Sequence, residues 1–122
     1  RHHWGTDFDI YDPSLLPSGT KLQLTCSEYQ QRGYFAELSH WLSENMCKFD
    51  FYRPYQTDLG GVAPEPWHIS YHPIAHKCLQ TLTPMIIHDL IMKNNVLGKS
   101  LICQHLPMIY KQYICNINLN RK

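Results

Sequence analysis

Apolar side chains recur every three or four positions between Gly33 and Met46, and this spacing predicts a helix with one apolar face. Two stretches near the end of the chain, PMIIHDLIMKN and GKSLICQHLPMIYKQYICNI, show the same helical spacing. Thr83 before Pro84 is typical of a helix start, which places the beginning of the first stretch. Pro107 predicts a kink or a break in the second.

Three other segments predict strands. DFDIY, residues 7–11, alternates polar and apolar side chains, and WHISYH, residues 67–72, is extended in pattern up to Pro73. KFDFYRPY, residues 48–55, is expected to end by Pro54, because proline cannot donate a ladder hydrogen bond. Loops rich in proline and glycine separate these segments. The order predicts an α+β fold with a small central antiparallel sheet and with flanking and C-terminal helices.

Composition narrows the class of protein. A chain of 122 residues fits a single domain, so we treat residues 1–122 as one unit that ends in a frayed polar tail, NLNRK. Eleven basic and ten acidic residues nearly cancel, which argues against nucleic acid as a partner. His88 and Asp89 interrupt the longest apolar stretch, so we expect no transmembrane segment.

Cysteine usage gives a weaker indication. The five cysteines form no CxxC pair, so a structural zinc knuckle is not expected, and at least one thiol stays unpaired within a monomer. Free cysteines favour a reducing compartment, so a cytoplasmic location stays open. The chain begins at Arg1 without a methionine, and we therefore expect that a further N-terminal segment precedes it.

The opening residues RHHWGTDFD could carry two ligands for a metal ion. His2 and Asp9 are seven positions apart, which on a straight strand would separate them by about 23 Å on opposite faces. They can converge only if the chain bends between them, and Gly5 is the residue that permits such a bend. Imidazole nitrogen and carboxylate oxygen both suit zinc.

The segment EPWHISYH supplies what a catalytic zinc would still require. His68 would be a third protein ligand and would leave a fourth position for water, while Glu65 could take a proton from that water. Pro66 restrains the backbone between them, and Trp67 adds bulk that excludes solvent. Such a site would hydrolyse an amide bond.

Each of these residues also has a structural interpretation. Histidines near a chain end are usually solvated, Asp9 could face solvent from a strand, and Glu65 could be an ordinary loop charge. His72 is a conceivable ligand by strand parity, but we interpret it as a rim residue. The remaining histidines are interpreted as surface or structural residues: His40, His76, His88 and His105. No nucleophile elbow accompanies any serine or cysteine, which disfavours covalent catalysis.

Two motifs in the chain resemble those of one enzyme family. HHWGTDFD is similar to the SxHxxGxAxD signature of VanY-type D-alanyl-D-alanine carboxypeptidases, and EPWHISY is similar to their ExWHxxY signature. The motifs occur in the family's order, and the likeness extends from Arg1 to about Pro73. It implies the fold shared by lysostaphin-like, D-Ala-D-Ala and hedgehog domains, in which a central antiparallel sheet carries the metal.

The resemblance assigns roles to individual residues. It implies that His2, Asp9 and His68 hold Zn²⁺ and that Glu65 is the catalytic base. Trp67 and Tyr71 match the family's aromatic positions and would shape the substrate pocket.

The chain departs from the family pattern at two points. Asp7 stands where the family has a small residue and adds a carboxylate near the ion. The family's upstream arginine, which helps to hold the substrate carboxylate, is not in this sequence, and Arg53 is the candidate that could contribute instead.

We therefore predict a zinc metallopeptidase that hydrolyses peptidoglycan stem peptides in the manner of a D-Ala-D-Ala carboxypeptidase. Two alternatives remain open: an endopeptidase of the same fold, and a non-catalytic, zinc-stabilised binding module. The expected location is the bacterial cell envelope or periplasm. The sequence makes no prediction of oligomeric state.

Overall fold

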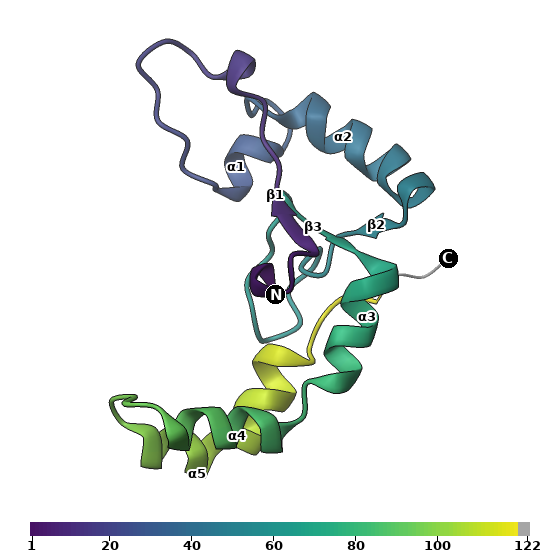
Figure 1. Cartoon of the computed structure of the whole chain (residues 1–122). Coiled ribbons are helices and arrows are strands. Elements are labelled where there is room, and N and C mark those ends of the chain that lie inside the picture. Colours follow the sequence, from purple (N-terminus) through teal and green to yellow (C-terminus); the bar gives the residue numbers. More distant parts are fainter. Residues whose placement is uncertain (120–122) are drawn as a thin grey trace.

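Three short strands form the antiparallel sheet that the sequence predicts (Figure 1). In the computed structural model, which describes residues 1–119, they are β1 (Asp7–Asp9), β2 (Phe51–Tyr52) and β3 (His68–Tyr71). Their order is β1-β3-β2, so β3 lies in the middle and pairs with both neighbours. The α+β class is confirmed.

Five α-helices accompany the sheet within residues 1–119. They are α1 (Cys26–Tyr29), α2 (Ala36–Asn45), α3 (His72–Thr81), α4 (Pro84–Lys93) and α5 (Lys99–Ile109). In Figure 1, α1 and α2 lie on one side of the sheet, while α3 leads away to α4 and α5, which lie side by side. None of the helices in this described part is long and apolar enough to cross a membrane.

Helix α2 matches the helix predicted from the spacing of apolar residues between positions 33 and 46. Its apolar face is buried only in part: Leu42 is buried, while Trp41 keeps about half of its surface exposed. Phe35, which comes just before the helix, is fully buried, and its ring packs against Tyr29 of α1. These aromatic contacts join α1 and α2 to the core.

The segment around β2 differs from its prediction. Residues 48–55 were expected to form a strand, but Met46–Phe49 form a 3₁₀ turn, and the strand itself is only Phe51–Tyr52. Asp50 between them has a φ of 61°, which is the left-handed region and ends the turn. A tight turn therefore replaces the first half of the predicted strand.

Helix α3 is absent from the sequence prediction. Pro73 was interpreted as the end of a strand, but β3 stops at Tyr71 and His72 begins the helix. Proline fits the first turn of a helix because the amide hydrogen that it lacks has no partner there. His72, predicted to be a rim residue on a strand, therefore lies in the first turn of α3.

The two C-terminal helices begin nearly where the sequence predicts, but α5 ends at Ile109, well before the end of the predicted helical stretch. The Thr83 hydroxyl accepts a hydrogen bond from the Ile86 amide at 3.3 Å, so Thr83 is the N-cap of α4. Pro107 lies inside α5 without dividing it. The helix instead changes three residues after Pro107 to a π-helical turn, Tyr110–Ile114.

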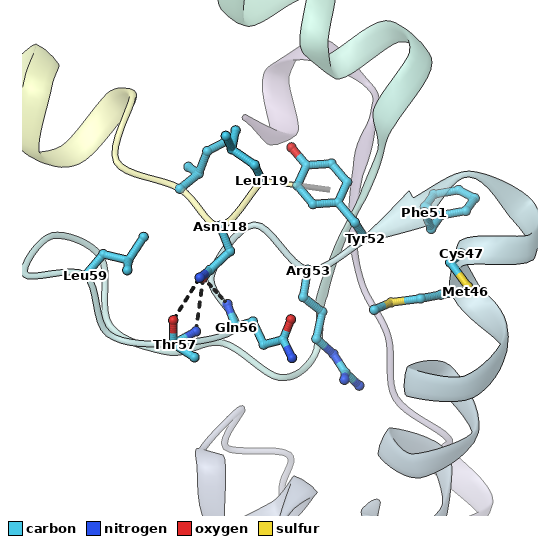
Figure 2. Close-up of a pocket in the computed structure, with 11 residues that line it drawn as sticks. Met46, Cys47, Phe51, Tyr52, Arg53, Gln56, Thr57, Leu59, Asn118 and Leu119 are labelled. Carbon is cyan, nitrogen blue, oxygen red and sulfur yellow. Dashed lines mark hydrogen bonds between the residues drawn. The ribbon is translucent and has the colours of Figure 1, made fainter. Parts of the chain in front are cut away.

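The start of the predicted polar tail is anchored (Figure 2). The Asn118 side-chain oxygen accepts hydrogen bonds from the amides of Gln56 and Thr57 at 2.8 and 3.0 Å, and its backbone amide donates to the Pro54 carbonyl at 2.8 Å. Asn118 therefore holds the loop after β2, contrary to the expectation of fraying. The last residues of the predicted tail, 120–122, lie outside the described residues.

The chain bends at Gly5, as the spacing of His2 and Asp9 requires. His2–Trp4 form a 3₁₀ turn that closes with a hydrogen bond from the Gly5 amide to the His2 carbonyl at 3.0 Å. Gly5 then has φ 70° and ψ 17°, a left-handed conformation that side chains with a Cβ disfavour. The bend reverses the direction of the chain between the turn that holds His2 and strand β1.

We predict that Gly5→Ala lowers the free energy of unfolding by roughly 1–2 kcal/mol, because alanine is strained in the left-handed region. Gly98 is a matched control: it has the same φ and ψ, and a Cβ meets no atom within 4 Å at either position. Chemical denaturation should show similar losses for Gly5→Ala and Gly98→Ala. Zinc affinity should fall only in Gly5→Ala, and equal zinc affinity in both variants would contradict the role given to the bend.

Candidate metal centre

Three side chains converge at one face of the sheet: His2, Asp9 and His68. Asp9 of β1 lies directly opposite His68 of β3 in the antiparallel register, which brings cross-strand side chains into contact. The bend at Gly5 returns His2 to the same place, with its ring centroid 4.6 Å from that of His68. The long-range pairing of β1 with β3 and one local turn thus assemble the group.

Two of the three donor-to-donor distances in this group are close to those around a zinc ion. Asp9 Oδ1 lies 3.5 Å from His2 Nε2 and 3.6 Å from His68 Nδ1, and all three donor atoms lie within 4.8 Å of one another. Atoms that bind one tetrahedral zinc at about 2.0–2.2 Å are about 3.3–3.6 Å apart. The two distances from Asp9 therefore match those around a tetrahedral zinc ion.

The group is buried on one side and open on the other. The His68 side chain is 4% exposed, whereas those of His2 and Asp9 are 49% and 35% exposed. Solvent or a substrate can therefore reach the group past His2 and Asp9, while His68 forms its floor.

Glu65 lies beside the same group. A turn closed by a hydrogen bond from the His68 amide to the Glu65 carbonyl, at 3.2 Å, returns the glutamate side chain toward the imidazole. Glu65 Oε2 is 3.0 Å from His68 Nδ1, and its side chain is 28% exposed. The carboxylate is therefore close to the donor atoms and accessible from solvent, which a proton acceptor requires.

Each histidine uses one ring nitrogen for a hydrogen bond to Asp7 and presents the other to the group. His2 Nδ1 donates to the backbone carbonyl of Asp7 at 3.0 Å, which leaves Nε2 facing Asp9. His68 Nε2 donates to Asp7 Oδ2 at 2.7 Å, which leaves Nδ1 facing Asp9 and Glu65. This is the arrangement in which an outer partner fixes the orientation of a metal-binding imidazole.

The Asp7 carboxylate is fully buried and well supplied with hydrogen-bond donors. It accepts from Arg1 Nε at 2.8 Å, from the Ser70 hydroxyl at 2.9 Å, and from Thr6 and His68. Burial alone would raise the pKa of Asp7, but the bonds from His68 and Thr6 and the charge of Arg1 outweigh it and hold that pKa well below its ordinary value. These contacts favour the negatively charged form of Asp7 beneath the group.

The electrostatic surroundings of His68 favour its positively charged form. Burial lowers its pKa, but hydrogen bonds to Asp7 and Glu65 and the negative charges of both carboxylates outweigh burial and raise the pKa above its ordinary value. The same negative surroundings favour a metal cation at that place.

The aromatic residues predicted to shape the pocket lie in two different places. The Trp67 ring packs against Tyr29, with centroids 5.5 Å apart. Strand alternation places Tyr71 on the face opposite His68, where its ring contacts Phe51 at 5.3 Å. Tyr55, which the sequence did not indicate, lies edge-on to the His68 ring at 5.1 Å.

The hydrogen bonds of Arg53 go to residues outside the metal group. Its guanidinium donates to the Pro66 carbonyl at 2.8 Å, to the Ser43 hydroxyl at 2.7 Å and to the Ser39 carbonyl at 3.0 Å. These bonds tie helix α2 to the loop before β3. Arg53 also lines a separate cavity of about 570 Å³, whose lining includes none of the metal group (Figure 2).

Sequence reasoning identified Asp7 as an extra carboxylate near the ion but not its contacts. Asp7 and Asp9 are two positions apart on β1, so their side chains lie on the same face of the strand, and this could have been predicted from the sequence. The register that sets Asp7 opposite Ser70 and next to His68 depends on long-range pairing, and no local signal carries it.

Comparison with known proteins agrees with this geometry. The sequence profile of the family described as "VanY: D-alanyl-D-alanine carboxypeptidase" matches residues 1–74, which is more than half of the chain and contains the whole metal group with Glu65. The chain belongs to the VanY family. Family membership indicates a peptidase of the D-Ala-D-Ala carboxypeptidase type.

A bacterial relative extends the similarity beyond the part that matches the VanY profile. An uncharacterized protein of Haemophilus influenzae (strain Rd) is 46% identical over 116 residues, which cover 93% of this chain and 88% of the relative. Because the match covers 93% of this chain, it extends into α4 and α5, which lie beyond residue 74. No solved structure matches the chain.

We predict that Asp9→Ala lowers the zinc affinity of this VanY-family site. Loss of a residue that only hydrogen-bonds to a ligand lowers metal affinity by roughly 10–100-fold, and loss of the ligand Asp9 should lower it further. Competition with a chromogenic chelator measures the affinity. His3→Ala is the control, because His3 is exposed, adjoins His2 and is not a member of the metal group. Equal affinities for the two variants would argue against the ligand assignment.

Proposed function

We propose that this VanY-family protein is a zinc-dependent peptidase that cleaves the terminal peptide bond of peptidoglycan stem peptides ending in D-Ala-D-Ala. The observation that carries the proposal is the convergence of two imidazole nitrogens and one carboxylate oxygen beside a second, accessible carboxylate, that of Glu65. Family membership supports the choice of substrate.

His2 Nε2, Asp9 Oδ1 and His68 Nδ1 would hold the zinc ion. When bound there, zinc would polarise the scissile carbonyl and lower the pKa of a water molecule toward neutrality. His2 and Asp9, which are partly exposed, border the open side from which a peptide would approach.

Glu65 is the proposed general base and general acid. Its carboxylate takes a proton from the attacking water and then delivers the proton to the amine that leaves when the peptide bond breaks. Two features support this role: the turn that fixes the glutamate relative to His68, and the 28% exposure of its side chain, which leaves it within reach of a substrate.

The donor count favours this enzyme over a zinc-stabilised binding module. A structural zinc is normally enclosed by four protein ligands. Within residues 1–119 the metal group comprises three side chains, two of them partly exposed. An open position beside a carboxylate is what hydrolysis needs. A peptidoglycan substrate supports the bacterial cell envelope as the proposed site of action.

We predict that Glu65→Gln lowers kcat by about 10²–10⁴-fold, because the amide cannot accept the proton of the attacking water. Zinc affinity should stay close to that of the wild type, since Glu65 is not one of the three donors. Glu44→Gln is the control, as this exposed glutamate lies on α2 and pairs with His40. Full hydrolysis by zinc-loaded Glu65→Gln would rule out the role.

Carboxypeptidase and endopeptidase action can be separated with two substrates. We expect the zinc-loaded protein to release D-Ala from a stem peptide ending in D-Ala-D-Ala with a free carboxylate, and to cleave the matching C-terminal amide much more slowly. Chromatography of the products measures both rates. Equal rates on the two peptides would favour an endopeptidase.

A further inference from the structure

We propose that Asp7 is a positioning residue that fixes, through its side chain and its own backbone, which nitrogen of each histidine faces the metal. The inference rests on the proposed function, in that it takes His2, Asp9 and His68 as the metal ligands. It adds a residue that the ligand assignment does not include.

The side chain of Asp7 acts on His68. Its Oδ2 atom lies 2.7 Å from Nε2, and both side chains are almost completely buried, at 0% and 4% exposure. A carboxylate oxygen in this position accepts, so Nε2 carries the proton of this bond. Glu65 Oε2 also lies 3.0 Å from Nδ1, but the Glu65 side chain is 28% exposed and can turn toward solvent when a metal binds, whereas the buried Asp7 carboxylate is fixed. In neutral His68 the lone pair is then on Nδ1, the atom that lies 3.6 Å from Asp9 Oδ1.

The backbone of Asp7 acts on His2. The carbonyl oxygen can only accept, so the 3.0 Å contact assigns a proton to His2 Nδ1 and leaves the lone pair on Nε2. That nitrogen lies 3.5 Å from Asp9 Oδ1. The two histidines therefore present opposite ring nitrogens to one point, and the same residue sets both.

The Asp7 carboxylate is itself held in place. Arg1 donates from Nε at 2.8 Å, and its Nη2 donates to the Ser70 hydroxyl at 2.7 Å, which in turn donates to Asp7 Oδ1 at 2.9 Å. The Thr6 hydroxyl gives a further bond to the same oxygen. A carboxylate fixed by three groups can orient His68 without itself rotating.

The contact between the Asp7 carboxylate and His68 depends on an aspartate at position 7, where the family motif has a small residue. The SxHxxGxAxD motif has a small residue at this position, which would still offer its carbonyl to His2 but no carboxylate to His68. The backbone half of the arrangement therefore depends on the bend and on β1, whereas the side-chain half depends on aspartate.

The wild-type protein gives the first test. In protein labelled with ¹⁵N and loaded with ¹¹³Cd²⁺, scalar coupling between cadmium and nitrogen identifies the bound atom of each ring. We expect coupling to Nδ1 of His68 and Nε2 of His2, with protons on the other two nitrogens. Coupling to Nε2 of His68, or absence of a cadmium complex, would overturn the proposal.

Variants give the second test, in which zinc affinity is measured by chelator competition. Asp7→Ala should lower affinity by roughly 10–100-fold, and Asp7→Asn, which keeps an acceptor oxygen for His68, should lose less. Ser70→Ala is the matched control: it removes a hydrogen bond from the same carboxylate, while Arg1 and Thr6 still hold it. Its affinity should stay within about threefold of the wild type.

Circular dichroism of each variant separates loss of the fold from loss of positioning. If Asp7→Ala does not fold, then Asp7→Asn against Ser70→Ala decides, and equal affinities for that pair would overturn the proposal. Failure of the proposed function has a different signature. In that case the expected nitrogens bind cadmium and the variants rank as expected, but the wild-type protein with zinc hydrolyses no stem peptide.

Discussion

The antiparallel register between β1 and β3 is the constraint on which the candidate site depends. It sets Asp9 opposite His68 and Asp7 opposite Ser70, so that four polar side chains share one face of the sheet. Side chains alternate along a strand, and a shift of one residue would therefore turn both aspartates to the other face. Phe8 and Ile69, which pair between them, occupy that other face and make such a shift unfavourable.

The polar network beneath the site compensates for burying charge. An ionised carboxylate taken out of water is unfavourable unless it is paired and hydrogen-bonded, and Asp7 has both an ion pair with Arg1 and several hydroxyl and imidazole donors. Buried ion pairs of this kind add little net stability, while breaking one by removing a partner costs about 3–5 kcal/mol. The network is therefore better understood as a device for orientation than as a source of stability.

Local patterns in the sequence predicted the features that depend on neighbouring residues. The spacing of apolar residues gave α2, Thr83 gave the start of α4, and the separation of His2 from Asp9 required the bend at Gly5. Helix α3 escaped prediction because a proline can end a strand or begin a helix, and the choice depends on packing. The contacts of Asp7 and Arg53 escaped it because both join segments that only the tertiary fold brings together.

Asp7 and His68 are 61 residues apart in the chain, and the pairing of β1 with β3 closes the long loop between them. Such closure carries an entropic cost that grows with loop length and that the formation of a local helix does not carry. During synthesis from the N-terminus, His2 and Asp9 leave the ribosome long before β3 exists. Any ion that all three ligands hold together can therefore be acquired only once the middle of the chain has emerged and folded back onto its beginning.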